Sequence, residues 1–242
     1  MKCIVLAAGY ATRLYPLTKN FPKPLLTVAG KTILDHLLDD IHNSGKVDEF
    51  IVVSNHVFYK HFEEWAQGKT YKVTLLDDGT TTNENRLGAV KDIAFAIGEL
   101  SLSDDLLVIA GDNLLSFSLK EFLEYFERKN SSVIMRYFES DYESLKKRGV
   151  IEKLDGDRVL GMVEKSPEPP TNWCVPPFYI YKRDDLHLIN EAIESGVSTD
   201  APGSFTAWLT KKTVVNSWEM TGVRYDIGNI ESYNKVKEIF EN

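Results

Sequence analysis

Two basic residues, Arg13 and Lys23, follow a run of small residues at positions 7–9 and 11. Small side chains let backbone N–H groups come close to an anion, because no bulky Cβ substituent blocks the approach. Arg13 offers a planar fork of donors and Lys23 offers a point charge, so both can converge on one anion. The prolines on both sides of Lys23 stiffen its backbone and lower the entropy lost on binding. This stretch is therefore predicted to hold a phosphate.

The residues around these cations carry a resemblance to a known family. The run from Leu6 to Leu14, followed by Tyr15 to Thr18 and by Pro22-Lys23-Pro24, resembles L-A-A-G-x-G-T-R-L-x-P-L-T and the later P-K-P of the sugar-phosphate nucleotidyltransferases. The glucose-1-phosphate thymidylyl-, uridylyl- and cytidylyltransferases are enzymes of this kind. Ala11 stands where the family usually has a second glycine. Because alanine resists positive φ, we expect the loop to take a slightly different path over the nucleotide.

The resemblance implies that this loop binds a nucleoside triphosphate. A pyrimidine nucleotide is preferred, because the commoner members of the family use one. A tight strand-to-helix turn without a ligand is the alternative interpretation of the same residues. The nucleotide-binding residues implied in this way are Leu6, Ala7, Ala8, Gly9, Tyr10, Ala11, Thr12, Arg13, Lys23, Gly88 and Asp112.

Two aspartates are candidate ligands for a divalent cation. Asp112 lies two residues after a predicted buried strand that ends at Ala110, where a carboxylate points into the cleft that should hold the triphosphate. Mg²⁺ usually takes one or two carboxylates, with phosphate and water as its other ligands. By resemblance, Asp112 is the first metal-binding aspartate of the family, and Asp226 is the second, in a motif usually written D-I-G-T. Each aspartate alone could equally cap a turn or a helix. We expect Mg²⁺ as the cofactor, bound by Asp112 and Asp226.

The reaction implied by the family is the attack of a phosphomonoester oxygen on the α-phosphorus of the triphosphate, with pyrophosphate as the leaving group. Two anions must meet, so positioning and cationic stabilisation supply nearly all of the catalysis. Arg13 is expected to hold the leaving β- and γ-phosphates, and Lys23 the α-phosphate or the incoming phosphate. Arg13, Lys23 and Asp112 are the predicted catalytic residues.

The acceptor side is matched by shorter motifs. Val163-Glu164-Lys165 resembles V-E-K-P, in which the glutamate holds sugar hydroxyls and the lysine holds the acceptor phosphate. Gly149-Val150 resembles the Y-G-V of the family, with arginine in place of the tyrosine. Glu164 and Lys165 could instead be an exposed charge pair, and Asp200 could be a helix cap rather than an acceptor ligand. The predicted acceptor-binding residues are Gly149, Glu164, Lys165, Trp173 and Asp200.

The run from Trp173 to Tyr179 departs from the family. Val175 and Pro177 stand where an asparagine and a glycine are expected, so a side-chain amide and a backbone donor are missing. The run is also aromatic, and an aromatic wall can bind a quaternary ammonium group. The same aromatic residues could simply pack in the core.

Gly88, in Leu87-Gly88-Ala89, resembles the L-G-T-A turn that touches the base and ribose in the family. A glycine at a helix start permits close backbone approach, but it could also be an ordinary N-terminal glycine. The polar stretch 77–85 could line the base pocket or be only a loop, and the sequence does not decide between the two.

Three classes of function compete. The first is Mg²⁺-dependent nucleotidyl transfer to a phosphomonoester, with a sugar 1-phosphate as the leading acceptor and a phosphocholine-like or amide-bearing phosphate as the alternative. The second is a noncatalytic nucleotide-sensing subunit, against which the retained Arg13, Lys23, Asp112 and Asp226 speak. The third, a dinucleotide-dependent oxidoreductase, is poorly supported because the loop lacks G-x-G-x-x-G.

Composition narrows the partners. The 242 residues carry a net charge of −8, which argues against a nucleic-acid surface because that would need a basic stripe. The apolar runs are too short to span a membrane and the first residues do not form a signal peptide, so no membrane partner is expected. Cys3 and Cys174 form neither a disulfide framework nor a zinc site, and a cytoplasmic location is the default. The oligomeric state stays open, a homo-oligomer included.

Alternating strands and helices must position these residues. Buried strands are predicted at 2–7, 49–54, 72–76 and 105–110, with helices at 32–42, 57–65 and 87–97 between them. Later in the chain, strands at 149–154 and 158–164 flank an Asp-Gly-Asp turn, further strands are predicted at 131–138, 178–181 and 213–218, and helices at 185–194 and 231–240.

This alternation predicts an α/β fold with a doubly wound, mostly parallel, Rossmann-like sheet. The family adds a small mixed lobe that binds the acceptor. We therefore expect one nucleotidyltransferase domain over 1–242, in which residues 1–115 mainly bind the nucleotide and residues 116–242 mainly bind the acceptor. Ligands of such sheets lie beyond the carboxyl ends of the strands, which is where the glycine loop and Asp112 are expected.

Overall fold

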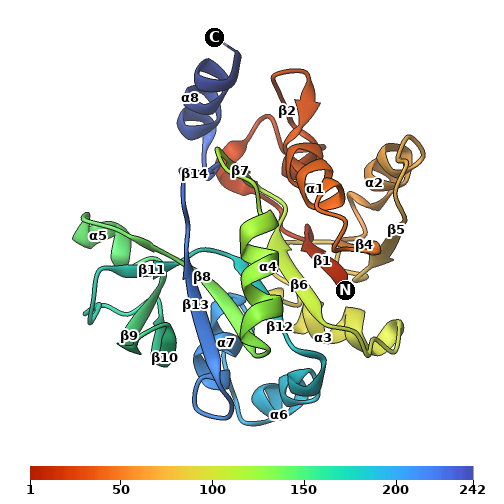
Figure 1. Cartoon of the computed structure of the whole chain (residues 1–242). Coiled ribbons are helices and arrows are strands. Elements are labelled where there is room, and N and C mark those ends of the chain that lie inside the picture. Colours follow the sequence, from red (N-terminus) through yellow and green to blue (C-terminus); the bar gives the residue numbers. More distant parts are fainter. Residues whose placement is uncertain (242) are drawn as a thin grey trace. The chain divides into compact units, whose positions relative to one another are not determined.

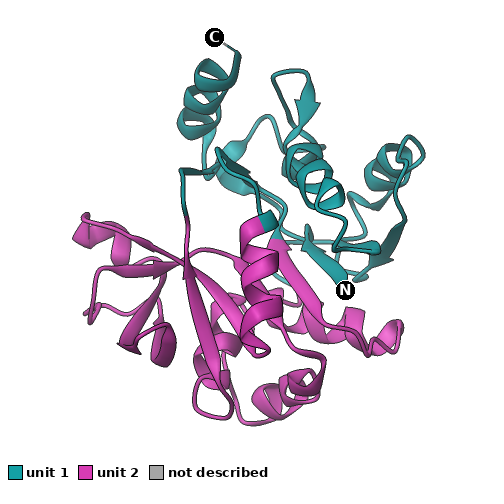
Figure 2. Cartoon of the chain, viewed as in Figure 1, with its two compact units in different colours: residues 1–86, 110–120, 221–242 teal, residues 87–109, 121–220 magenta. Residues whose placement is uncertain are grey.

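The computed structural model describes residues 1–241, which form two compact units. Unit 1 contains Met1–Arg86, Ala110–Lys120 and the segment from Thr221 onward, and unit 2 contains Leu87–Ile109 and Glu121–Met220 (Figure 2). Neither unit is a continuous stretch of chain. No helix within 1–241 is long and apolar enough to cross a bilayer.

Unit 1 is built on a three-stranded parallel sheet (Figure 1). Its strands follow the order β1-β4-β5 and are β1 (Lys2–Leu6), β4 (Glu49–Ser54) and β5 (Val73–Asp77). The central strand β4 is buried along its whole length, as expected for a strand with a neighbour on each side and helices nearby. Helices α1 (Ile33–Asn43) and α2 (Tyr59–Ala66) connect these strands.

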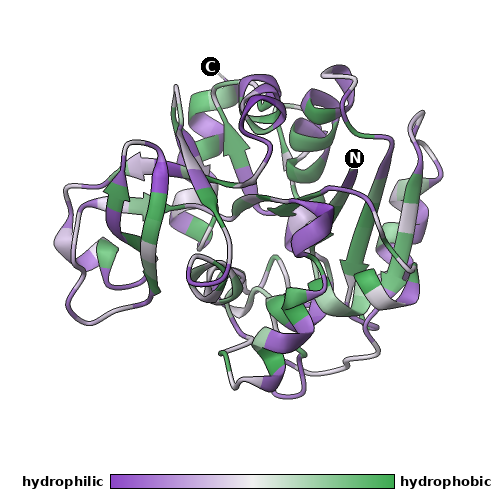
Figure 3. Cartoon of the chain, turned by 60° about the horizontal axis from the view of Figure 1, so that its bottom comes forward, coloured by the Kyte–Doolittle hydropathy of each residue, from purple (hydrophilic) through white to green (hydrophobic). Residues whose placement is uncertain are grey.

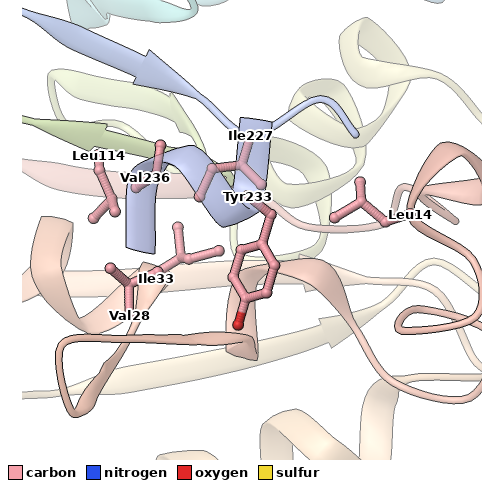
Figure 4. Close-up of a cluster of buried hydrophobic side chains, with 7 residues drawn as sticks. All are labelled: Leu14, Val28, Ile33, Leu114, Ile227, Tyr233 and Val236. Atoms are coloured by element: carbon pink, nitrogen blue, oxygen red, sulfur yellow. The ribbon is translucent and has the colours of Figure 1, made fainter. Parts of the chain in front are cut away.

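Short elements complete unit 1 around the predicted phosphate loop. They are the 3-10 turns η1 (Thr12–Leu14) and η2 (Lys23–Leu25), the antiparallel pairs β2 (Thr27–Val28) with β3 (Lys31–Thr32) and β7 (Asn113–Leu115) with β14 (Arg224–Asp226), and helix α8 (Ile230–Glu241). Apolar side chains from several of these elements and from α1 share one buried cluster (Figure 4), made of Leu14, Val28, Ile33, Leu114, Ile227, Tyr233 and Val236. The segment after residue 220 therefore closes the core beneath the turn that carries Arg13.

Unit 2 contains a mixed sheet in the order β11-β9-β10-β13-β8-β12-β6, in which β11 also pairs with β8. Its strands are β6 (Leu106–Ala110), β8 (Ser132–Phe138), β9 (Gly149–Asp155), β10 (Arg158–Glu164), β11 (Trp173–Val175), β12 (Phe178–Tyr181) and β13 (Val215–Glu219). Its helices are α3 (Ala89–Glu99), α4 (Lys120–Lys129), α5 (Tyr142–Leu145), α6 (Leu188–Glu194) and α7 (Gly203–Leu209). Hydropathy alternates along the helices (Figure 3), as expected when one face of each is buried.

The predicted elements of the first half agree with β1, β4, β5, β6, α1, α2 and α3 to within two residues. The α/β fold class is confirmed. Antiparallel pairings dominate in unit 2, where β13 with β8 is the parallel pair, so the mixed part is larger than a small lobe. The predicted helix at 185–194 starts later, at Leu188, after a 3-10 turn at Arg183–Asp185.

The two units do not follow a single cut near residue 115, because 87–109 belong to unit 2 and the segment from 221 belongs to unit 1. The proposed assignment of nucleotide binding to 1–115 and acceptor binding to 116–242 stays a prediction.

Candidate active site

The predicted phosphate loop borders a cavity of about 210 Å³ in unit 1. The cavity is lined by Leu6, Ala7, Gly9, Ala11, Lys23, Pro24 and Asp112. Six of these seven residues are among the nucleotide-binding residues predicted from the sequence. The lining therefore joins the carboxyl end of β1 to both a cation and a carboxylate.

The loop is fixed by polar contacts to its backbone. Ala11 has φ 46° and ψ 42°, in the left-handed region, so this alanine adopts the positive φ that it was expected to resist. The carbonyl of Ala11 accepts hydrogen bonds from the Leu14 N–H (2.9 Å) and from the buried Thr18 hydroxyl (2.8 Å). The carbonyl of Ala8 accepts one from Asn55 Nδ2 (3.0 Å), a fully buried side chain at the end of β4. These bonds hold a strained backbone in place.

Lys23 lies within this frame as a nearly buried cation, 9% exposed. Its Nζ is 2.5 Å from Asp112 Oδ2 and donates to the carbonyl of Ile227 at 2.5 Å. Ile227 belongs to the predicted D-I-G motif, so Lys23 joins the phosphate loop to both aspartate segments. A buried ammonium requires such partners, because removing its hydration without compensation is costly.

A chain of polar contacts links the two predicted metal ligands. Asn113 Nδ2 donates to Asp112 Oδ1 at 2.7 Å, and Asn113 Oδ1 accepts from Arg224 Nη1 at 2.5 Å. Arg224 Nη1 also lies 3.7 Å from Asp226 Oδ2. In the β7–β14 pair, Asp226 lies opposite Asn113, next to Asp112. The fold thus brings together the two segments that carry these aspartates, which are far apart in the sequence.

These carboxylates suit a hard divalent cation. Both side chains are partly exposed, 30% for Asp112 and 41% for Asp226, and an oxygen of Asp112 already contacts the ammonium of Lys23. Within 1–241 no group of three or more His, Cys, Asp and Glu side chains could hold a metal. A cation at Asp112 and Asp226 would therefore need phosphate and water as its other ligands, as Mg²⁺ commonly does.

The remaining predicted residues of the loop differ in their surroundings. Arg13 is exposed on η1, and no described residue forms a hydrogen bond or ion pair with it, so its guanidinium is available to a ligand. Thr12 is also exposed. Tyr10 is instead buried against Phe58, with its hydroxyl 3.5 Å from Thr80. Burial raises the pKa of the Tyr10 phenol.

Gly88 lies in unit 2, directly before α3. The group that lies close to its backbone is the 199–200 segment of the same chain. Gly88 has φ 91°, and a Cβ there would lie 2.5 Å from the carbonyl oxygen of Thr199. The first N–H groups of α3, those of Ala89 and Val90, donate to the carbonyls of Asp200 (3.3 Å) and Thr199 (3.0 Å). Gly88 is thus required by the packing of the 199–200 segment, whatever contact it makes with a nucleotide.

Among the predicted acceptor-binding residues, Gly149, Lys165 and Asp200 surround Glu164 in unit 2. A Cβ added to Gly149 would lie 2.8 Å from Glu164 Oε2, and one added to Gly203 would lie 2.0 Å from it, so the carboxyl occupies space that only glycines leave open. The pKa of Glu164 is raised to about 7, chiefly by burial. The nearby Asp200 adds to this rise, and the charge of Lys165 opposes it. A carboxyl with this pKa can accept or donate a hydrogen bond near neutral pH.

Lys165 and Asp200 form an ion pair beside Glu164, with Lys165 Nζ 3.0 Å from Asp200 Oδ2 and both side chains about half exposed. Lys165 has φ 52°, and its N–H donates to the Arg148 carbonyl at 2.9 Å. This unusual backbone conformation directs the side chain of a strand-end residue toward Asp200.

The aromatic run packs within the protein. Phe178 and Tyr179 are buried in β12, and Tyr179 stacks on Tyr181 with ring centroids 5.9 Å apart. Trp173 lies edge-to-face with Phe138, and the guanidinium of Arg136 lies 4.9 Å from the Trp173 ring centroid. The cation that lies over the Trp173 ring is therefore one of this chain's own side chains.

Comparison with known proteins gives the family. The family model described as "Nucleotidyl transferase" matches residues 2–242. The chain belongs to the nucleotidyl transferase family.

Relatives in this family differ in nucleotide and sugar. The chain is 28% identical to a Sulfolobus acidocaldarius protein provisionally named a mannose-1-phosphate guanyltransferase, over 98% of this chain and 62% of that protein. It is 24% identical to the UTP–glucose-1-phosphate uridylyltransferase AglF of Haloferax volcanii, over 98% of this chain and 96% of the relative. The chain thus spans about three fifths of the first relative and nearly all of the second.

Solved structures of nucleotidyl transferases share the fold. A UDP-glucose pyrophosphorylase complexed with UDP-glucose matches with a TM-score of 0.83 and 20% identity, over 99% of this chain and 98% of that chain. A UTP-bound UGPase from Acinetobacter baumannii matches with a TM-score of 0.78 and 18% identity, over 99% and 92%. The nucleotide-diphospho-sugar transferase type of fold is confirmed by these matches.

Four residues that hold the site were given no role in the sequence analysis, although Thr18 is the last residue of the loop motif. Asn55, Thr18, Asn113 and Arg224 position the loop backbone or the carboxylates. Asn55 carries a usable signal, because a polar residue directly after a buried strand is predicted to lie at the ligand-binding edge of the sheet. Arg224 carries none, since its partner Asn113 is remote in the sequence.

Proposed function

We propose that this chain transfers a nucleotidyl group from a nucleoside triphosphate to a sugar 1-phosphate and releases pyrophosphate. The observation that carries this proposal is the Lys23–Asp112 pair at the cavity bordered by the phosphate loop. The family, and the transferase names of the relatives, support the same reaction class.

In this reaction an oxygen of the acceptor phosphate attacks the α-phosphorus. The bond between that phosphorus and the oxygen bridging to the β-phosphate breaks, and pyrophosphate leaves with the bonding electron pair. Arg13, exposed and without a partner among the described residues, would bind the β- and γ-phosphates as charge accumulates there. Lys23, held at the cavity, would neutralise charge near the α-phosphate.

Asp112 and Asp226 would hold Mg²⁺, because both offer partly exposed hard oxygen ligands, Asp226 in β14 and Asp112 directly before the partner strand β7. When bound, the ion supplies Lewis-acid stabilisation of phosphoryl oxygens. The chain's own residues arrange the site: Asn113 donates to one oxygen of Asp112, and Lys23 contacts the other.

The acceptor is proposed to bind in unit 2 at Glu164, Lys165 and Asp200. The Glu164 carboxyl, bounded by Gly149 and Gly203, would bind a hydroxyl group, and Lys165 would bind the acceptor phosphate by leaving its pair with Asp200. A sugar 1-phosphate offers both groups. The internal packing of the aromatic run supports a sugar over a phosphocholine-like acceptor.

The test is a matrix of acceptor phosphates against nucleoside triphosphates, with pyrophosphate release as the readout. Turnover with a sugar 1-phosphate and UTP, dTTP or CTP is expected, since we keep a pyrimidine nucleotide as our proposal. Turnover restricted to non-sugar phosphates would overturn the acceptor. Tight nucleotide binding without pyrophosphate release from any combination would favour a noncatalytic sensor.

A further inference from the structure

One arginine, Arg224, contacts both Asp226 and Asn113, the residue that follows Asp112. The side chain of Arg224 is only 5% exposed, and its Nη1 donates to Asn113 Oδ1 at 2.5 Å while lying 3.7 Å from Asp226 Oδ2. Asn113 is fully buried, so its amide has no access to solvent. A hydrogen bond between a buried guanidinium and a buried amide fixes both groups, because breaking such a bond away from water is costly.

The guanidinium decides which way the Asn113 amide points. Arginine has N–H donors and no acceptor, so only the oxygen of the Asn113 amide can face it. The Nδ2 group must then face the other way, where it donates to Asp112 Oδ1 (2.7 Å) and to the Ala110 carbonyl (3.3 Å). A reversed amide would bring its oxygen against the Asp112 carboxylate, which is also an acceptor. Arg224 therefore sets the hydrogen bond that Asp112 receives.

Each oxygen of Asp112 consequently has a defined neighbour. Oδ1 accepts from Asn113, and Oδ2 faces the ammonium of Lys23. Across the β7–β14 pair, the same guanidinium places positive charge beside Asp226. Such outer contacts orient metal-binding groups, and their loss commonly weakens metal affinity ~10–100-fold.

We propose that Arg224 is a positioning residue that aligns Asp112, through Asn113, and holds Asp226 beside it for a divalent cation. This inference rests on the proposed function of the same site. It assigns Arg224 no contact with substrate.

The test measures cation binding without turnover. Mn²⁺ binding is followed by electron paramagnetic resonance, with an α,β-methylene nucleoside triphosphate that cannot be cleaved. Arg224→Gln keeps a polar side chain but removes the charge and the fork, and Arg224→Lys keeps only the charge. We expect Mn²⁺ affinity to fall ~10-fold or more in Arg224→Gln, and less in Arg224→Lys. Circular dichroism verifies that each variant is folded.

Arg136→Lys is the matched control. The Arg136 side chain is also largely buried, donates to Ser217 Oγ at 3.0 Å and lies 3.6 Å from Glu219, but it belongs to unit 2. Its substitution should leave Mn²⁺ affinity unchanged even if stability falls. Equal losses in Arg136→Lys and the Arg224 variants would overturn the inference, because the effect would then be general destabilisation.

Asn113→Ser is an independent test, because this variant keeps the Arg224 guanidinium. If Arg224 acts through Asn113, the double variant Asn113→Ser/Arg224→Gln should lose less Mn²⁺ affinity than the sum of the two single losses. Full additivity, or an affinity within twofold of the parent in folded Arg224→Gln, would refute the inference. Failure of the proposed function looks different: the parent would bind Mn²⁺ and nucleotide, and depend on Arg224, yet release no pyrophosphate. A parent protein that binds no Mn²⁺ would reject the inference directly.

Discussion

Lys23 and Asp112 form a pair whose members differ in burial, and this difference makes their substitutions unequal. Lys23 is 9% exposed, whereas Asp112 retains contact with solvent. Asp112→Ala leaves an almost buried ammonium with the Ile227 carbonyl as its one partner among residues 1–241, so we expect a loss of about 3 kcal/mol in the free energy of unfolding. Lys23→Met should cost less, because the remaining carboxylate can hydrate. Urea denaturation of the two variants measures the difference.

Both substitutions should lower pyrophosphate release ~10²-fold or more, because each removes a charge from the proposed reaction centre. Lys60→Met, on the exposed surface of α2, is the control and should change neither pyrophosphate release nor the free energy of unfolding. Near-normal turnover in Asp112→Ala with Mg²⁺ present would show that Asp112 is not a metal ligand.

Ala11 offers a test of strain in the phosphate loop. Its φ of 46° costs an alanine roughly 1–2 kcal/mol, whereas glycine adopts this conformation freely but loses about 0.5–1 kcal/mol through unfolded-chain entropy. Ala11→Gly should therefore raise the free energy of unfolding by about 0.5–1 kcal/mol, seen as a rise of about 2 °C in Tm. Ala29, with φ 47°, should give the same gain on substitution by glycine. A lower Tm for Ala11→Gly alone would mean that the methyl group makes contacts that outweigh its strain.

Glu164 should make stability depend on pH. Its folded-state pKa of about 7 lies above its ordinary value of 4.5, so between these values the unfolded chain loses a proton that the folded chain keeps. The free energy of unfolding should fall as pH rises through this window, by on the order of 3 kcal/mol, and level off above it. Glu164→Gln should lack this step. Parallel slopes for the two proteins between pH 4.5 and 7 would contradict the assignment.

The sequence could predict residues whose role lies in their own chemistry. Arg13 and Lys23 stand in a long motif, Asp112 follows a buried strand, and the structure brings Lys23 and Asp112 into contact. It could not predict Arg224, whose role depends on a hydrogen bond to Asn113, 111 positions away. Trp173 was assigned to acceptor binding, and nothing in the sequence indicated that the Arg136 guanidinium would lie over its ring.

Gly88 caps the start of helix α3 and Gly98 lies within it, and these two glycines should respond oppositely to alanine. Gly88 faces the Thr199 carbonyl and has φ 91°, whereas Gly98 lies inside the helix with open space around its Cβ position. Gly88→Ala should destabilise the protein by about 2 kcal/mol or more, and Gly98→Ala should stabilise it by about 0.5–1 kcal/mol. Urea midpoints measured on both variants provide the comparison. Equal midpoints would mean that the 199–200 segment yields without cost.

Elements with strong apolar patterns were predictable, and elements that depend on distant partners were not. Strands β1, β4 and β6 each contain at least four consecutive apolar residues, which is typical of buried strands. The short strands β7 and β14 exist because they pair with each other across the sequence. Helix α4 was missed although it buries Phe122, Leu123, Tyr125 and Phe126, because charged residues interrupt these positions.

At the scale of the whole molecule, the discontinuity of unit 1 predicts how a fragment behaves. A fragment of residues 1–115 contains Leu14, Val28, Ile33 and Leu114 but lacks the residues from 221 onward that pack against them. We expect it to unfold in urea without a cooperative transition and to bind the hydrophobic dye ANS. The full chain is the control. Cooperative unfolding of the fragment, with nucleotide affinity equal to that of the full chain, would show that residues 1–115 are a sufficient nucleotide-binding half.

The order of segments in unit 1 also has a consequence for biosynthesis. Asp112 and the phosphate loop are translated before residues 121–220, whereas Ile227, which accepts from Lys23, and Asp226 follow them. A nascent chain on the ribosome therefore carries the Lys23 ammonium long before one of its two native partners has been synthesised. Until then, the incomplete unit exposes apolar surface, which makes it a natural client for chaperones during synthesis.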